Sequence, residues 1–269
     1  MNDEEQYLKY LKKQEFSPNT IRSSLASYRQ YHSLHDDLSA ESLLQYKEYL
    51  LKNYKMSTVN NRIYGINRYL EFRAESDFRL SAVRLQQTPF LDTIISQEDY
   101  EHLKQCLKKD GNLYWYFVVR FLACTGARVG ELIQIKAEHL SLGYMDLYAK
   151  GGKVRRIYFP EGLCREALQW ISDRGISSGF IFTGRSGKQI TPRGIGSQLK
   201  VLALRYGIPS ETVYPHAFRH RFAKNFLAKF NDISLLADLM GHESIETTRI
   251  YLTKSSREQR ELIDRIVTW

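Results

Sequence analysis

Two short segments of the chain carry side chains that suit the binding of a phosphate group. The segment "TGARVGEL" places Arg128 just after a glycine, and Glu131 follows three residues later. The segment "HAFRH" sets His216 and Arg219 three residues apart, which brings both to one face of a helix. Arginine is a permanent bidentate cation for phosphate oxygens, whereas histidine can move a proton near neutral pH. These residue types together predict a site that binds phosphate and transfers protons.

Two further segments could add a general acid and a nucleophile. The segment "AKGGKVRR" places Lys150 and Lys153 around Gly-Gly, a hairpin signal, so that an ammonium at the tip could protonate a departing alkoxide. The segment "LMGHESIETTRIYL" places His242 after a glycine typical of a helix C-cap, and Tyr251 nine residues later. A tyrosine phenol can store a phosphoryl group as a covalent ester.

Each of these segments also has a purely structural interpretation. The arginine and glutamate of the first segment could form an ordinary helical ion pair, and basic turn tips are common. His216 and Arg219 could be a surface pair, and His220 turns to another side of the helix, where we expect a structural role. Tyr251 is one of eighteen tyrosines and would, taken alone, be a core or surface residue. Only the combination favours a catalytic site.

The elements that must position these residues are mainly helical. Amphipathic helical patterns fill residues 1–75, among them one with Ser17 as N-cap and Pro18 at the first helical position. Periodicity fades over residues 76–95, which predicts a linker, and a new helix is expected after Ser96. Within 96–269, "NLYWYFVVRFLAC" is apolar nearly all round and predicts a buried central helix. The segment "YMDLYAKGGKVRRIYF" predicts one small antiparallel sheet, so the fold class is mainly α in two domains.

One helix of the first domain has a polar flank that could contact a ligand. In "STVNNRIYGINRYLEF" the apolar residues recur at spacings of four, three and four. The flanking amides and guanidinium groups suit phosphates and base edges, although a solvated helix face is the alternative. The predicted contact residues on this flank are Asn60, Asn61, Arg62, Asn67 and Arg68.

Composition favours a polyanionic partner. The 269 residues include 39 basic and 30 acidic side chains, for a net charge of +9. Residues 1–95 are nearly balanced, with 13 basic and 12 acidic side chains, so most of the excess falls in residues 96–269. No apolar run is long enough for a membrane span, and the acidic start lacks a signal-peptide core. Three cysteines predict neither a disulfide framework nor a zinc site, which fits a cytoplasmic protein.

In this order, the four segments resemble the motifs of the tyrosine recombinases, the phage-integrase family, and most of all its short Xer-type members. The first helices likewise resemble that family's core-binding, SAM-like domain. By position, the resemblance assigns a catalytic set of Arg128, Lys150, His216, Arg219, His242 and Tyr251. Glu131 supports this set, Lys153 remains the alternative to Lys150, and Lys153 and Arg193 join the predicted DNA contacts.

The resemblance implies a site-specific DNA recombinase. Tyr251 would attack the DNA to give a 3′-phosphotyrosyl link, His216 would take the phenol proton, and Lys150 would protonate the leaving 5′ oxygen. The arginines and the later histidine would hold the phosphate in place of a metal, so we expect no metal, no ATP and no other cofactor. Two such exchanges would pass through a Holliday junction.

The implied partners are double-stranded DNA with paired inverted-repeat sites and other recombinase protomers. Four subunits would assemble on two sites in the nucleoid, with or without a second recombinase or accessory protein. The C-terminal segment, about 255–269, carries Leu262, Ile263, Ile266 and Val267 on a helical stripe and would dock on a neighbouring protomer; packing on its own domain is the alternative. Two other functions stay open at this point: a type IB topoisomerase-like relaxing enzyme, and a DNA-binding regulator without catalysis.

Overall fold

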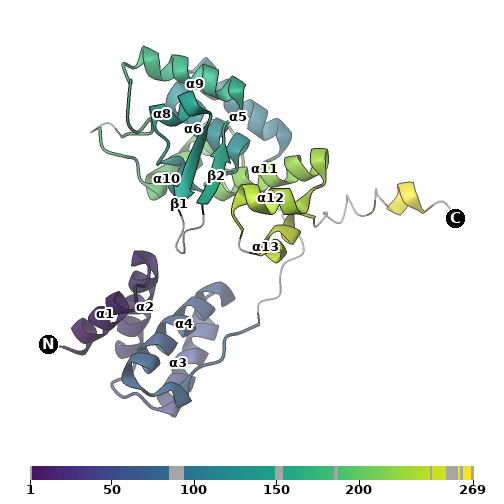
Figure 1. Cartoon of the computed structure of the whole chain (residues 1–269). Helices are drawn as coiled ribbons and strands as arrows, with labels where there is room; N and C mark the ends of the chain where they lie inside the picture. The colour runs from purple at the N-terminus through teal and green to yellow at the C-terminus, as the bar shows by residue number, and fades with distance from the viewer. Residues whose placement is uncertain are drawn as a thin grey trace. The chain divides into compact units, whose positions relative to one another are not determined.

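The computed structural model divides the chain into two compact units, Met1–Gln87 and Thr88–Trp269 (Figure 1). The structure describes residues 2–84, 94–148, 154–184, 187–242, 244–252, 260 and 263–267. Within those residues, no helix is long and apolar enough to cross a bilayer. Each unit has a hydrophobic core of its own.

The first unit is a set of four helices followed by one short 3₁₀ turn. Their bounds are α1 Asp3–Lys13, α2 Pro18–His32, α3 Ala40–Asn53, α4 Met56–Arg73 and η1 Ser76–Phe78. The Ser17 hydroxyl accepts from the backbone N–H of Thr20 and caps α2. Helices α2 and α4 approach closely at Gly65, where a Cβ would lie 2.2 Å from the Ser27 hydroxyl oxygen. A glycine is therefore needed for this crossing.

The second unit is helical apart from one hairpin. Its elements are α5 Gln97–Lys109, α6 Leu113–Thr125, α7 Val129–Leu132, α8 Ala137–Leu142, β1 Tyr144–Tyr148, β2 Val154–Tyr158, α9 Glu161–Asp173, α10 Pro192–Arg205, α11 Pro215–Phe230, α12 Ile233–Met240, α13 Ile245–Arg249 and η2 Ile250–Leu252. Strands β1 and β2 pair antiparallel, from Tyr144 opposite Tyr158 to Tyr148 opposite Val154. The predicted class, mainly α with one small antiparallel sheet, is confirmed.

Helix α6 lies in the core of the second unit, as its apolar surface predicts. Phe117, Phe121 and Leu122 are buried, and α6 packs against α11. It ends at Gly126, whose φ of +62° is left-handed and whose Cβ would lie 2.5 Å from the Phe222 ring. Both constraints require glycine. The turn at Gly126 brings Arg128 within hydrogen-bonding distance of Gly241, at the C-terminal end of α12.

Candidate active site

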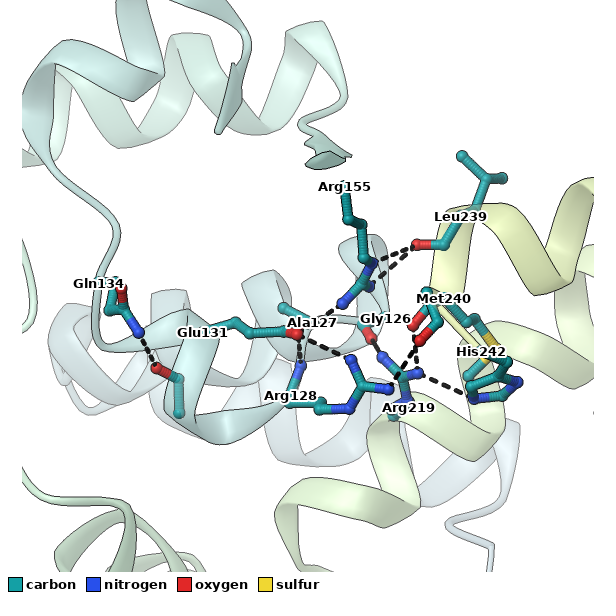
Figure 2. Close-up of polar contacts among 12 residues, drawn as sticks. Gly126, Ala127, Arg128, Glu131, Gln134, Arg155, Arg219, Leu239, Met240 and His242 are labelled. Atoms are coloured by element: carbon teal, nitrogen blue, oxygen red, sulfur yellow. Dashed lines mark hydrogen bonds and ion pairs between the residues drawn. The ribbon is translucent and has the colours of Figure 1, made fainter. Parts of the chain in front are cut away.

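Arg219 lies at the centre of the polar cluster and joins three helices. It projects from α11, and its side chain is almost completely buried. Its Nη1 donates to the Gly126 carbonyl at 2.5 Å, and its Nη2 donates to the Met240 carbonyl at 2.6 Å (Figure 2). Both carbonyls lie at helix C-termini, where the helix dipole favours a cation. The guanidinium is therefore held in one orientation by backbone rather than by flexible side chains.

The charge of Arg219 survives its burial. Burial lowers the pKa of Arg219 to about 10, helped by the nearby charges of Arg128 and Arg155. The group thus stays protonated at neutral pH. Arg128 and Arg155 both pair with Glu131, and in the described part of the chain Arg219 has no ion pair, so positive charge is in excess at this place. Such an excess favours the binding of an anion.

Arg128 follows the Gly126 turn and faces the same cluster. Its Nη1 donates to Glu131 at 2.9 Å, and its Nη2 donates to the Gly241 carbonyl at 3.1 Å. Glu131 also accepts from the backbone N–H of Arg128 at 2.7 Å, which fixes the start of α7. The Arg128 side chain is 41% exposed, so one side of this guanidinium is open to a ligand.

Arg155 belongs to the cluster, although the sequence analysis did not single it out. It reaches from β2 to Glu131 at 2.6 Å and donates twice to the Leu239 carbonyl, at 3.0 and 2.9 Å (Figure 2). Although burial of Glu131 works in the opposite direction, the charge of Arg155 and hydrogen bonds from Arg128 lower the Glu131 pKa. Period-two alternation could have revealed Arg155, because it shares a strand face with buried Ile157.

His242 follows the left-handed Gly241 and contacts both Arg219 and Thr248. Its Nε2 lies 3.0 Å from Arg219 Nη2, and its Nδ1 lies 2.7 Å from the Thr248 hydroxyl oxygen. Burial and the charges of Arg219, Arg128 and Arg155 lower the pKa of His242 to about 4. The ring is therefore neutral at pH 7.

Tyr251 lies in η2, where it is buried and within hydrogen-bonding distance of a histidine. Its side chain is 6% exposed, and its hydroxyl lies 3.1 Å from His220 Nδ1. The His242 ring is nearly parallel to the phenol, with centroids 6.3 Å apart. Burial raises the pKa of Tyr251, against the opposing effects of Arg219 and Arg128. The phenol is thus protonated at neutral pH and lies beside the arginine cluster.

His220 and His216 occupy successive turns of α11, with ring centroids 6.3 Å apart. His220 was expected to be structural, yet it is the histidine that contacts the Tyr251 hydroxyl. Burial and the charges of His216 and Arg219 lower its pKa to about 4. His216 is exposed in the first turn, and desolvation with the same arginines, Arg219 and Arg128, lowers its pKa too. The neutral His220 ring contacts the phenol and can accept its proton, and the His216 ring lies one helical turn from His220.

A cavity of about 770 Å³ opens on this cluster. It lies between the β1–β2 hairpin and α12, and both Arg128 and His242 contribute to its wall. Lys150 and Lys153, predicted at the hairpin tip, fall outside the described residues, between Tyr148 and Val154. The open face of Arg128 is therefore reached from the side on which the hairpin lies.

Two of the predicted DNA contacts in the first unit, Asn60 and Asn67, are engaged by backbone groups of the chain itself. Asn60 exchanges two hydrogen bonds with the backbone of Val83, both 2.8 Å, and Asn67 does the same with Leu80, both 2.9 Å. Both asparagines are buried. An Asn side chain matches one backbone N–H and C=O pair, so these amides bind the segment after α4 instead of facing a ligand.

The other predicted contact residues differ in how accessible they are. Asn61 is exposed and Arg62 half-buried, as expected for a flank that faces outward. Arg68 is half-buried, lies over the Phe16 ring and donates to the Tyr64 carbonyl at 3.3 Å. Arg193 is exposed in the first turn of α10 in the second unit.

The gathered groups define what the site can do. Two guanidinium groups with fixed orientation can hold the nonbridging oxygens of a phosphate. A phenol beside them can act as nucleophile, and neutral histidines can take its proton. This combination fits phosphoryl transfer to a tyrosine.

Comparison with known proteins identifies a matching family and its relatives. Residues 93–258 match the model of the phage integrase family. The tyrosine recombinase XerA of Pyrococcus furiosus is 27% identical over 97% of this chain and 92% of its own length. The tyrosine recombinase XerC of Pseudomonas aeruginosa is 35% identical over 52% of this chain and 48% of its own.

Solved structures share the fold at lower identity. A lambda integrase dimer bound to a core site aligns with a TM-score of 0.74 at 15% identity, covering 94% of this chain and 95% of that one. The crystal structure of XerA recombinase aligns with a TM-score of 0.57 at 21% identity, covering 99% and 98%. The matched residues 93–258 include the whole arginine, histidine and tyrosine cluster, and the chain belongs to the phage integrase family.

Proposed function

We propose that this chain is a site-specific DNA recombinase that cuts and rejoins DNA through Tyr251. The observation that carries the proposal is the meeting of one buried phenol with His220 and the Arg219–His242 pair in a single unit. Relatives named tyrosine recombinases support the same activity. A DNA-binding regulator would have no use for a nucleophile in this place.

In the proposed cleavage step, the Tyr251 oxygen forms a bond to the scissile phosphorus and the bond from phosphorus to the 5′ oxygen breaks. The phenol proton passes to His216 once DNA is bound, with His220 holding the hydroxyl beforehand. Lys150, or Lys153 in its place, gives a proton to the 5′ oxygen. The product is a 3′-phosphotyrosyl link and a free 5′ hydroxyl, and the reverse reaction with a partner strand completes the exchange.

The arginines stabilise the transition state of this step. Charge on the nonbridging oxygens is redistributed as the phosphorus changes its bonding, and Arg128 and Arg219 are oriented before substrate arrives. Loss of one such preorganised donor costs about 10²–10³ in rate. Because these groups supply the positive charge, we propose that cleavage needs neither metal nor ATP.

We propose that the first unit, within residues 1–75, binds DNA as a core-binding domain and that residues 96–269 carry the catalysis. The exposed residues Asn61 and Arg193 and the half-buried Arg62 are the proposed contacts, with Arg68 in a supporting position. A tetramer on two inverted-repeat sites would be joined by the segment 255–269. In its described part, Ile263, Ile266 and Val267 are exposed apolar side chains.

The test is a nicked duplex that loses its 5′-hydroxyl fragment after cleavage and so traps the covalent complex. The wild-type chain should become attached to the labelled strand, in EDTA and without ATP. Tyr251→Phe should bind the duplex without attachment. A wild-type chain that never becomes attached to any candidate site would refute the proposal. Relaxation of a supercoiled plasmid without a recombination site would favour the topoisomerase-like alternative.

A further inference from the structure

Thr248 is a buried polar residue to which the proposed reaction gives no role. It lies in α13 and has no exposed surface. Its hydroxyl oxygen is 2.7 Å from Nδ1 of His242, the shorter of the two polar contacts made by that ring. Burial of a hydroxyl is favourable only where it has a partner, and here the partner is a residue of the site.

The other contact of His242 determines which ring nitrogen carries the proton. Arg219 can only donate hydrogen bonds, so His242 Nε2 must accept at 3.0 Å and carries no hydrogen. A neutral imidazole has one N–H, which is then on Nδ1. Thr248 therefore accepts this hydrogen bond in the structure.

This arrangement is the opposite of the one that the reaction requires. To donate to a phosphate oxygen, His242 needs a hydrogen on Nε2. Adding a second proton would create an imidazolium among Arg219, Arg128 and Arg155, and burial together with these charges lowers the pKa of His242 to about 4. Moving the single hydrogen from Nδ1 to Nε2 gives the same donor without adding charge.

We propose that Thr248 is a positioning residue that lets His242 change tautomer, from accepting a hydrogen bond from Arg219 to donating one to the scissile phosphate. A hydroxyl suits both states because it is an acceptor and a donor. With Nδ1–H it accepts, as in the structure. When Nδ1 carries no hydrogen, the hydroxyl donates to Nδ1 after rotation about the Thr248 C–O bond. This inference rests on the proposed function.

The change balances without any net proton uptake. His242 Nδ1 releases its hydrogen to solvent, and Nε2 takes one from solvent. Arg219 Nη2, which had donated to His242 Nε2, then donates to the incoming phosphate oxygen. The Thr248 hydroxyl hydrogen then points at Nδ1, and the ring stays neutral and in place.

The first test compares Thr248→Val with Thr248→Ser in the full chain. Valine keeps the shape and removes the hydroxyl, whereas serine keeps the hydroxyl. At saturating nicked duplex, valine should slow covalent-complex formation about 10–10²-fold, somewhat less than loss of a whole donor. Serine should retain most of the rate. Equal loss in both variants, or a wild-type rate in valine, would overturn the proposal.

The second test separates positioning from packing. Glutamine at residue 242 presents an amide N–H donor near the Nε2 position whatever Thr248 does. In a His242→Gln background, Thr248→Val should therefore cost little more in rate, so that the two effects are not additive. Fully multiplicative losses would mean that Thr248 supports only the packing of α13, and would overturn the proposal.

A third measurement does not depend on a Thr248 variant that folds. Nitrogen chemical shifts of the His242 ring should report Nδ1–H in the free Tyr251→Phe chain and Nε2–H when that chain is bound to an intact duplex. The same tautomer in both states would contradict the inference. Failure of the proposed function is a separate outcome, since it requires that the wild-type chain forms no covalent complex at all.

Discussion

Two sets of polar residues were predicted to face a ligand, and they end in opposite situations. On α4, Asn60 and Asn67 each meet one backbone N–H and one C=O, which matches an amide's donor and acceptor. In the second unit, Arg128 and Arg219 meet carbonyls at helix ends but have five donors each, more than these partners use.

Structural and functional polar residues differ in whether groups of the chain alone satisfy their hydrogen bonds and charge. A buried amide beside an irregular segment can be satisfied by backbone alone, and then nothing is left for a ligand. Arg219 is buried beside further arginines, and among the described residues the ion-pair partner of this group is Glu131 alone, so positive charge remains in excess. The unbalanced charge of the second region, not its polarity, is what indicates an anionic substrate.

Substitution of Arg219 should reduce the rate of cleavage more than any other change proposed. Arg219→Lys keeps a charge but replaces the planar fork with one ammonium, which cannot hold the Gly126 and Met240 carbonyls and a phosphate together. We expect a loss of about 10²–10³ in the single-turnover rate of covalent-complex formation, with duplex binding retained. Arg165→Lys, at an exposed pair with Glu161 on α9 and away from the cavity that opens on the cluster, is the matched control. A loss below tenfold in Arg219→Lys would contradict the assignment.

A second substitution asks whether the cluster needs its third arginine. Arg155→Met keeps the length of the side chain and leaves the Leu239 carbonyl and part of Glu131 without their partner. We expect the unfolding free energy to fall by about 2–3 kcal/mol and the cleavage rate by roughly tenfold, because Arg128 loses a fixed Glu131. Urea unfolding and the trapping assay measure the two effects. Unchanged stability would show that Arg155 is not part of the framework.

The two histidines nearest Tyr251 and Arg219 should make the stability of the second unit depend on pH. His220 and His242 have pKa values of about 4 in the folded chain, below the ordinary value of 6.5. Because the folded state disfavours their protonation, the stability is complete above pH 6.5 and is lost as the pH falls toward 4. We expect the unfolding free energy to fall by about 2 kcal/mol per histidine between pH 7 and pH 5. Urea midpoints at pH 7 and 5 should differ less in His220→Asn than in the wild type; an equal difference would be evidence against this environment.

The smallest effect is expected on the amide side. Asn67→Ala removes both hydrogen bonds to Leu80 and should lower the unfolding free energy by about 1–2 kcal/mol. The rate of covalent-complex formation at saturating duplex should not change. Asn61→Ala, on the same helix but exposed, should show the reverse: unchanged stability and weaker duplex binding. An Asn67 variant that is stable but binds DNA poorly would support the prediction that Asn67 contacts DNA.

Much of the fold could be predicted because local signals agreed with it. Ser17, Ser39, Ser96 and Thr191 cap the helices that follow them, and Gly241 ends α12 in the left-handed conformation. The period-two runs on either side of Gly-Gly form the predicted hairpin. Helix α9 was not predicted, although its amphipathic sequence buries Leu163, Ala167 and Trp170.

The details of the site were harder because they depend on contacts between distant segments. Nothing near Asn67 in the sequence shows that Leu80 will take its amide, thirteen residues later. The contact between His220 and Tyr251 joins residues 31 apart on elements whose packing is set by the core. Arg155 meets Leu239 across 84 residues. Motif order predicts the residues, but only tertiary packing shows which of them touch.

The bond network of Arg155 has a consequence for how the hairpin could be altered. Arg155 of β2 donates two hydrogen bonds to the Leu239 carbonyl of α12. Gly241 leaves room for the Arg155 side chain, because a Cβ there would lie 2.2 Å from Arg155 Cδ. Strand β2 and the end of α12 are therefore held together. Lengthening or shortening the chain between Tyr148 and Val154 should therefore leave the guanidinium groups in their alignment. That interval is thus a place where insertions or deletions can be made without disturbing the arginine framework.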